Sequence, residues 1–386
     1  MNNPKNIIYF ILIGFYIIFC SCEQTSLEDY KAFEYKMVKV LGLKFVLKND
    51  YGNSQIRIFN DTIVAFTVSN VFNKKTNLVD ENHIYSVQSI DKPQNKIEFN
   101  NPELRFPSIS PIDQFRNGCL YFGRFGKSTV QSLCSDGKLT EYFKQYNDTL
   151  FYANKVLLYK NLAVVNSMNG IFLFNLKNQQ LLWERKYQKE LSPFWSTIIG
   201  RRLIFSGRGY VSCLNLDNLI VEWSRKIGLG IYGGFKNGFN ATPIEHILND
   251  GNDLVIPTDS ACYLFDLITG KTVSKTPWKD IVSKESQYQT YFVENKKLYT
   301  SSTNNKNTLL CIDMVTNKKL WTIPYLDFVG IHKNHVLAII PSQKLFVVIN
   351  KNTGKIEHKV ANPNVSTSNF RFIDGYVLIN SLSLYK

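Results

Sequence analysis

The stretch that decides the fold is LFDLITGKTV at residues 264–273, because close copies of it recur along the chain. CIDMVTNKKLW follows at residues 311–321, and VINKNTGKIEH follows at residues 348–358. Each copy reads as a strand that ends in Asp or Asn, a short turn, and a second strand. A turn that recurs at intervals of about 40 residues predicts a propeller or a solenoid array.

Aligning the copies on the polar residue before the turn gives seven anchor positions. The residue eight positions after the anchor stands in the second strand and is aromatic in five of the seven copies. The pairs are Asp91 with Phe99, Cys134 with Tyr142, Asn175 with Trp183, Asn215 with Trp223, Asp266 with Ser274, Asp313 with Trp321, and Asn350 with His358.

The strand before each anchor avoids charge on both of its faces. The residue directly before the anchor is apolar in all seven copies, and the residue before that one is small or apolar. A strand that is covered on both faces belongs to a sheet packed between other sheets. Four-stranded sheets arranged radially, each covering its neighbours, satisfy this pattern, so we predict an all-β propeller.

The two ends of the chain indicate how the ring closes. Residues 370–386 resemble the first strands of a further unit, but the chain stops where the eighth anchor would stand. Residues 33–47 offer a strand before the first full unit. We therefore predict eight blades, the last completed by an N-terminal strand, since closure removes the free sheet edges. Seven blades is the alternative.

The N-terminus has the features of a signal segment. Lys5 is the only charged residue before an apolar run at residues 7–19, which is too short to span a bilayer and fits a secretory signal peptide. The run ends in FCSC and resembles a bacterial lipobox, in which Ser21 precedes the lipidated Cys22. We expect a signal peptide at 1–21, a polar tether at 22–32 and one propeller domain at 33–386. An uncleaved anchor and a soluble secreted protein are the alternatives.

Five cysteines follow Cys22, and they show no Cys-x-x-Cys pairing. Cys213 and Cys311 occupy the same repeat position in blades that are not adjacent, so we expect reduced, buried side chains. Cys119 and Cys134 flank one hairpin and form the one pair for which a disulfide stays open.

The three quoted stretches resemble the repeat of the PQQ-like, or quinoprotein-dehydrogenase-like, β-propellers. In that family an Asp-x-x-Thr-Gly-Lys turn precedes a Trp that docks between blades, which implies a docking role for Trp183, Trp223 and Trp321. A lipoprotein with this repeat is similar to a non-enzymatic branch that includes an outer-membrane barrel-assembly lipoprotein, a scaffold. The turns of blades 3 and 4 depart from the pattern because they lack the Gly.

The sequence offers no residues for catalysis. The quinoprotein dehydrogenases of the same superfamily are longer and have adjacent cysteines and calcium-binding acids, whereas this chain has neither pattern. We therefore predict no enzyme activity, no catalytic residues, no cofactor and no bound metal. The motif HKNH at residues 332–335 reads as a turn between strands, because residues three apart on a strand point to opposite faces.

The widest anchor spacing contains GLGIYGGFKNGFN at residues 228–240. Its Tyr232, Phe235 and Phe239 form a candidate partner-binding loop, with a connector packed on the rim as the alternative. The formal net charge of +14 fits Lys- and Asn-rich solvated loops, with attraction of an acidic partner or an anionic envelope polymer as the alternative. The cations are too dispersed for nucleic acid.

We therefore predict a lipid-anchored cell-envelope scaffold that binds a protein. By family analogy, its specific role would be in outer-membrane or envelope assembly. The membrane would be reached through the lipid anchor. One alternative is a PQQ-like periplasmic or surface enzyme with a small-molecule pocket at the central channel. Another alternative is a module that binds carbohydrate or a toxin.

Overall fold

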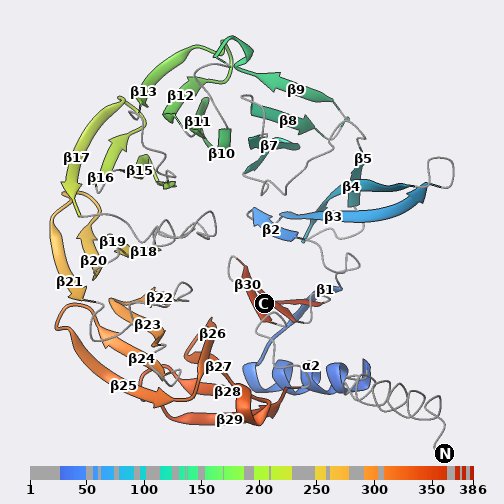
Figure 1. Cartoon of the computed structure of the whole chain (residues 1–386), viewed down its shortest axis with the longest axis vertical. Helices are drawn as coiled ribbons and strands as arrows, with labels where there is room; N and C mark the ends of the chain where they lie inside the picture. The colour runs from blue at the N-terminus through green and yellow to red at the C-terminus, as the bar shows by residue number, and fades with distance from the viewer. Residues whose placement is uncertain are drawn as a thin grey trace, which may run out of the picture.

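The computed structural model contains eight four-stranded antiparallel sheets arranged as a ring (Figure 1). The eight-bladed propeller is therefore confirmed, and the seven-bladed alternative is wrong. The structure describes residues 27–48, 55–59, 62–73, 78–90, 96–100, 114–123, 130–134, 136, 138–146, 153–167, 169–186, 195–207, 210–227, 248–257, 261–277, 291–302, 308–362, 370–373, 376–379 and 383–386.

Within each of blades 1 to 7, four consecutive strands are hydrogen-bonded in chain order. Blade 1 contains β2 (Gln55–Phe59), β3 (Thr62–Asn73), β4 (Leu78–Ser89) and β5 (Lys96–Asn100). Blade 2 contains β6 (Gln114–Arg116), β7 (Cys119–Gly123), β8 (Val130–Cys134) and β9 (Leu139–Tyr142). Blade 3 contains β10 (Ala153–Tyr159), β11 (Leu162–Ser167), β12 (Gly170–Asn175) and β13 (Leu181–Lys186). Blade 4 contains β14 (Trp195–Ile199), β15 (Arg202–Gly207), β16 (Tyr210–Asn215) and β17 (Ile220–Lys226).

The second half of the ring repeats the same order. Blade 5 contains β18 (Leu248–Asp250), β19 (Asp253–Pro257), β20 (Ala261–Asp266) and β21 (Thr272–Pro277). Blade 6 contains β22 (Tyr291–Glu294), β23 (Lys297–Ser302), β24 (Thr308–Asp313) and β25 (Lys318–Pro324). Blade 7 contains β26 (Asp327–His332), β27 (His335–Ile340), β28 (Leu345–Asn350) and β29 (Ile356–Ala361). Blade 8 contains β30 (Phe370–Ile373), β31 (Tyr376–Ile379), β32 (Ser383–Tyr385) and, from the N-terminal region, β1 (Phe45–Lys48).

In blades 2 to 7 the third strand is buried on both faces, as the charge-free pattern predicts. In β12, Leu173 packs with Leu203 and other residues of blade 4. Its neighbour Phe174 points the other way and packs with Val130 of blade 2. Because each blade covers the next in this manner, the hydrophobic core is divided into clusters in the seams between blades.

The repeated turn after the third strand has one geometry in blades 3 to 7. The anchor side chain accepts a backbone N–H from two or three residues further on, at 2.6–3.0 Å. The residue four positions after the anchor has a positive φ in all five blades, as in Gln179, Leu219, Gly270, Asn317 and Gly354. Blades 3 and 4 therefore form the same turn without the Gly that the family pattern requires.

The residue eight positions after the anchor has the same place in the strand pairing in blades 3 to 7, but not in blades 1 and 2. There the residue two before the anchor pairs with the residue eight after it, as Cys213 pairs with Trp223. A register shift in the outer strand of each of these blades supplies the extra residue. The described pairs of blades 1 and 2 lack this shift, so Phe99 and Tyr142 lie outside the docking position.

The N-terminal strand closes the ring, as predicted. Strand β1 pairs with β32, the last strand of the chain, and forms the outer edge of blade 8. The backbone N–H of Lys44 donates to the carbonyl of Lys386 at 2.9 Å, and the reverse bond has the same length. Strand β1 and the C-terminal strand are thus held in one sheet.

The expected strand over residues 33–47 is wrong in its first part. Helix α2 (Leu27–Leu41) occupies residues 33–41, and the strand begins only at Phe45. Phe33, Met37 and Leu41 are spaced four residues apart, which places them on one face of a helix. The helix also takes in residues 27–32, which were expected to be part of a polar tether.

Candidate functional site

Two of the three predicted docking tryptophans bridge adjacent blades. The indole Nε1–H of Trp223 in blade 4 donates to the carbonyl oxygen of Leu267 in blade 5 at 3.1 Å. In the same manner, Trp321 of blade 6 donates to the carbonyl oxygen of Lys351 in blade 7 at 3.1 Å. Each accepting residue directly follows an anchor, so the indole of one blade is hydrogen-bonded to the repeated turn of the next blade.

The glycine of each receiving turn makes room for the indole. A Cβ added at Gly270 would lie 2.4 Å from the ring of Trp223, and one at Gly354 would lie 2.7 Å from the ring of Trp321. Both glycines also have positive φ values, which disfavour a side chain. The Thr-Gly-Lys turn and the Trp are therefore two halves of one contact between successive blades.

In other seams, other side chains reach the turn of the next blade. Trp183 of blade 3 lies 5.8 Å from Phe205, centroid to centroid, and packs near Leu219, which takes the place of the Gly. Blade 5 has Ser274 where blades 3, 4 and 6 have Trp, and two residues later the hydroxyl of Thr276 donates to Asn317 Oδ1 at 2.7 Å. The residue in the turn thus differs with the side chain that reaches it: Gly lies under an indole ring, Leu219 packs in the same cluster as Trp183, and Asn317 accepts a hydrogen bond from Thr276.

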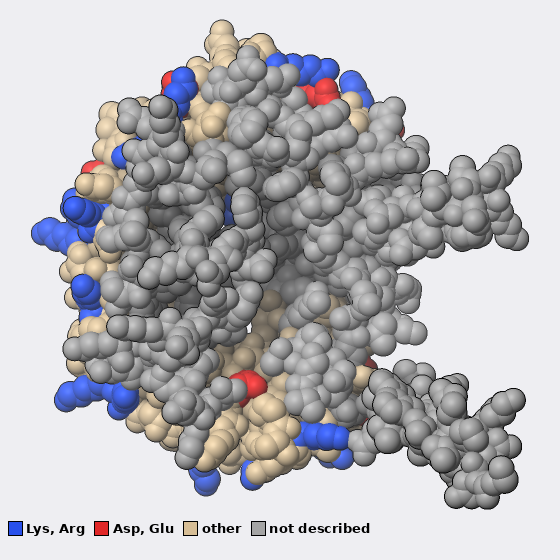
Figure 2. All heavy atoms as spheres, in the orientation of Figure 1, with Lys and Arg blue, Asp and Glu red and all other residues tan. Residues whose placement is uncertain are grey.

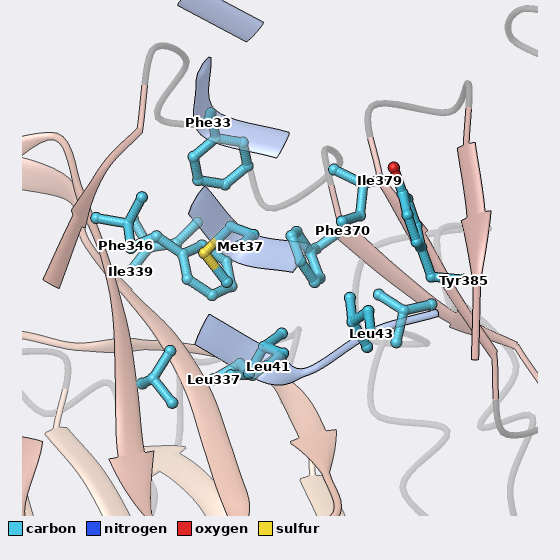
Figure 3. Packing of buried hydrophobic residues seen from close by; sticks show 13 residues of the cluster. Phe33, Met37, Leu41, Leu43, Leu337, Ile339, Phe346, Phe370, Ile379 and Tyr385 are labelled. Carbon is cyan, nitrogen blue, oxygen red and sulfur yellow. The ribbon is translucent and has the colours of Figure 1, made fainter. Parts of the chain in front are cut away.

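The seam between blades 7 and 8 is filled by helix α2 (Figure 3). Phe33 lies between two rings, 5.8 Å from that of Phe346 in blade 7 and 6.2 Å from that of Phe370 in blade 8. Met37 is fully buried beside them. His358 occupies the position of Trp in blade 7 but is exposed, and the described apolar contacts of this seam include residues of α2 instead.

Cys119 and Cys134 form a disulfide between the paired strands β7 and β8. The other described cysteines, Cys213, Cys262 and Cys311, are free and buried, which confirms the expectation for Cys213 and Cys311. Burial raises the pKa of Cys213 to about 12 and that of Cys311 to about 11. These thiols stay protonated near neutral pH and are poor nucleophiles.

We expect reduction of the disulfide to destabilise the protein by about 3 kcal/mol, because Cys119 and Cys134 close a loop with a sequence separation of 15. The measurement is chemical unfolding with and without a reducing agent. The double variant Cys119→Ser/Cys134→Ser should start at the lower stability and show no further response to the reducing agent.

The two histidines of HKNH lie at a turn, as predicted. They end β26 and begin β27, and they pair with each other across the two strands. His335 Nε2 lies 3.0 Å from Glu357 Oε2, whereas the buried Nε2 of His332 has no hydrogen-bond partner. Burial, followed by the charges of Lys333 and His335, lowers the pKa of His332.

We expect the free energy of unfolding to fall as the pH is lowered below about 6.5, the ordinary pKa of histidine. His332 has a lower pKa in the folded protein, so the unfolded chain binds more protons across this window. His332→Gln should therefore reduce the slope of stability against pH between about 6.5 and the lowered pKa. An unchanged slope would contradict this assignment, and His358→Gln, at an exposed site, provides the comparison.

Several basic side chains take part in contacts between blades. The buried Lys351 forms an ion pair with Glu294 of blade 6 and donates to the carbonyl of Lys333 at 2.7 Å. Lys160 of blade 3 lies 2.6 Å from Asp217 of blade 4. Other Lys and Arg side chains gather along the outer edge of the ring, over the outer strands of blades 3 to 7 (Figure 2).

Blade 1 carries a feature that the repeat pattern does not predict. Strands β3 and β4 pair without a break from Thr62 with Ser89 to Asn73 with Leu78. Strand β2 pairs only with residues 62–66 of β3, and β5 pairs only with residues 84–88 of β4. The remaining residues, 67–73 and 78–83, form a two-stranded extension, the blade 1 ribbon, which projects from the ring in Figure 1.

Four predicted site residues, namely Cys22, Tyr232, Phe235 and Phe239, lie outside the described residues. The chain containing the last three connects β17 of blade 4 to β18 of blade 5. Within the described ranges, no group of three or more His, Cys, Asp or Glu side chains could hold a metal ion. No helix in the described part of the chain is long and apolar enough to cross a membrane.

No protein-family model matches the chain, and no curated protein matches it. Among solved structures it is similar to BamB from Moraxella catarrhalis, with 14% identity over 89% of this chain and 97% of that chain, and a TM-score of 0.53. The chain has the PQQ-like β-propeller fold. A europium-containing methanol dehydrogenase matches this propeller with 9% identity over 83% of this chain and 81% of that one, at a TM-score of 0.49. AztD from Citrobacter koseri matches it with 14% identity, 81% and 86% coverage, and a TM-score of 0.48.

In this PQQ-like propeller the sequence identified the tryptophans but missed the blade 1 ribbon. The available signal was the length of the strand: residues 62–73 contain no Gly, Pro or charged residue and are rich in Val and Thr. Such a run is about twice as long as an average strand. The helix that fills the last seam had a signal too, in the four-residue spacing of its apolar residues.

Proposed function

We propose that this chain is a lipid-anchored β-propeller of the cell envelope that acts as a protein-binding scaffold. The apolar run at residues 7–19 and the Ser21-Cys22 sequence support export and lipidation. The disulfide between Cys119 and Cys134 fits an oxidising compartment outside the cytoplasm. A role in outer-membrane or envelope assembly follows from the family resemblance of the repeat, and the proposal includes no enzymatic activity.

The observation that carries the scaffold proposal is the blade 1 ribbon. Its seven residues on β3 extend about 23 Å at the usual rise per residue of a strand. The four-stranded sheet of blade 1 is complete without it, because β2 and β5 cover only the base of the hairpin. A projecting hairpin that its own blade does not require is suited to contact another protein.

The ribbon and the N-terminal end of α2 lie toward the same side of the ring. In Figure 1, the N-terminal end of α2 and the tip of the ribbon both extend beyond the ring on the right. Cys22 precedes the first residue of α2, Leu27, by five residues, which span at most about 18 Å when extended. A lipid at Cys22 would therefore keep the partner of the ribbon close to the membrane.

Tyr232, Phe235 and Phe239 are retained as a second proposed contact. Aromatic side chains supply much of the binding energy of protein interfaces. The sequence around them runs between the outermost strand of blade 4 and the innermost strand of blade 5. An anionic envelope polymer bound by the basic outer edge is the further partner that the charge suggests.

The test is crosslinking in native membranes, followed by purification and mass spectrometry of the full-length chain. In the variant, residues 68–83 are replaced by Asn-Gly, which joins Thr67 to its paired residue Ile84 through a two-residue turn. We expect this variant to fold and to lose the crosslinked partner. Retention of the same partner would reject the ribbon as the binding site, and quinone or calcium bound to the purified protein would favour an enzyme.

The anchor is tested separately with Cys22→Ala. We expect the altered protein to leave the membrane fraction, because lipidation at this residue would be its attachment. Cys22→Ala protein that stays in the membrane fraction would show that another segment anchors the chain.

A further inference from the structure

The blade 1 ribbon presents backbone that no described strand pairs with. Residues 67–73 of β3 pair with β4 on one side, while β2 ends its pairing at Phe66 on the other side. Residues 78–83 of β4 likewise extend beyond the pairing of β5. Alternate N–H and C=O groups along such an edge point outward, and another extended chain is the partner that satisfies the whole row.

The two edges of the ribbon differ in charge. Residues 67–73, TVSNVFN, contain no charged residue and no proline, whereas residues 78–83, LVDENH, include Asp80 and Glu81. Charged residues are a common protection against unwanted strand pairing. All eight outermost strands of the blades, β1, β5, β9, β13, β17, β21, β25 and β29, contain at least one charged residue. Of the two ribbon edges, the edge of β3 therefore has no charged side chain to prevent pairing with another strand.

We propose that an extended segment of an acidic partner protein adds to the edge of β3 along residues 67–73. This inference rests on the proposed scaffold function and specifies how the partner binds. Strand addition gives affinity through main-chain hydrogen bonds along the edge of the receiving strand. The protein that carries the segment is acidic overall, because a chain with a net charge of +14 attracts it over long distances.

Charge also argues against a second copy of this chain as the occupant. Two copies would bring together two bodies of +14 each, and their repulsion opposes the approach. A pair of seven-residue strands alone is also a small contact compared with the roughly 1,600 Å² of a standard stable interface. An acidic partner protein can enlarge the interface, because its negatively charged surface is attracted to this basic chain.

The test places a photocrosslinking amino acid at Thr67, Ser69 or Val71 of the full-length chain in its native membrane. If a strand adds to β3, the crosslinked position in the partner moves by about two residues per step, always in the same direction. The control position is Asn82 of β4, which pairs with Ser69 and should give none of this ordered series. Crosslinks to a second copy, or crosslinks without ordered progression, would overturn the inference.

A charge variant separates strand pairing from general attraction. Ser69→Lys/Val71→Lys should reduce the crosslinked yield at least tenfold, because the new charges obstruct strand addition. If an acidic partner were held by charge alone, the same variant would increase the yield, which would overturn the inference. Asn82→Lys, on the opposite strand, should keep the yield within about twofold. Loss of the partner on deleting the ribbon, together with disordered crosslinks, would reject strand addition but retain the scaffold.

Discussion

Gly270→Ala should destabilise the propeller by about 2–5 kcal/mol, although it adds only one methyl group. About 1–2 kcal/mol of this comes from the positive φ of 63° at the site. The rest comes from overpacking, which typically costs about 1–3 kcal/mol. The new Cβ would lie 2.4 Å from the buried ring of Trp223, which cannot move without losing its hydrogen bond to Leu267.

Gly251→Ala is the matched control for this variant. Gly251 has a nearly identical φ of 65°, but an added Cβ there meets nothing within 4 Å. We therefore expect Gly251→Ala to cost only the conformational part, about 1–2 kcal/mol. Equal losses of unfolding free energy from Gly270→Ala and Gly251→Ala, measured by chemical unfolding, would contradict a tight contact between the Trp223 indole and the turn at Gly270.

A double-mutant cycle tests the contact directly. Trp223→Ala alone should cost about 3–5 kcal/mol, as is usual for removing a large buried aromatic side chain. With the indole removed, the added cost of Gly270→Ala should fall to that of Gly251→Ala. The coupling energy between Trp223 and Gly270 should thus be about 1–3 kcal/mol, and a value near zero would show that the two residues act independently.

Met37→Asp should destabilise the closed ring by at least about 3 kcal/mol. The side chain of Met37 is 0% exposed in the seam between blades 7 and 8 (Figure 3), and its removal alone typically costs about 2–5 kcal/mol. The new carboxylate would in addition be buried among apolar side chains such as Phe346 and Phe370. We expect unfolding at lower denaturant and faster proteolysis of α2.

Tyr35→Asp is the control on the same helix. The side chain of Tyr35 is 71% exposed, so the same new charge should change stability by no more than about 0.5 kcal/mol. Similar losses from Met37→Asp and Tyr35→Asp would mean that the charge acts through the helix itself and that packing in the seam is unimportant.

The seams explain why some site residues were predictable and others were not. Trp223 and Gly270 stand 47 residues apart, yet each occupies a fixed place in a repeat of about that length, so the pattern predicted both. His358 has the same place in its repeat but lies exposed. The repeat could not show this, because α2 comes from the other end of the chain and fills that seam.

The blade 1 ribbon was missed for a different reason. The repeat was identified from the turn after the third strand, and the ribbon lies at the opposite end of β3 and β4. Counting from the turn also misplaced Phe99 and Tyr142, since they pair with residues six and four positions before their anchors, where the equivalent residues of blades 3 to 7 pair two positions before. Backbone pairing had to be seen before the overhang could be recognised, together with an edge that no described strand covers.

The sequence by itself determined the propeller, because the pattern of strand and turn repeats along the chain, and it predicted eight blades closed by an N-terminal strand with seven as the alternative. The tertiary structure settled the count at eight. The tertiary structure decided which seams contain an indole and which contains a helix, and it joined Cys119 to Cys134. These features depend on contacts between different strands and blades. Such contacts are set by strand register and by the space that neighbouring sheets leave, and neither quantity is written in any single segment of the chain.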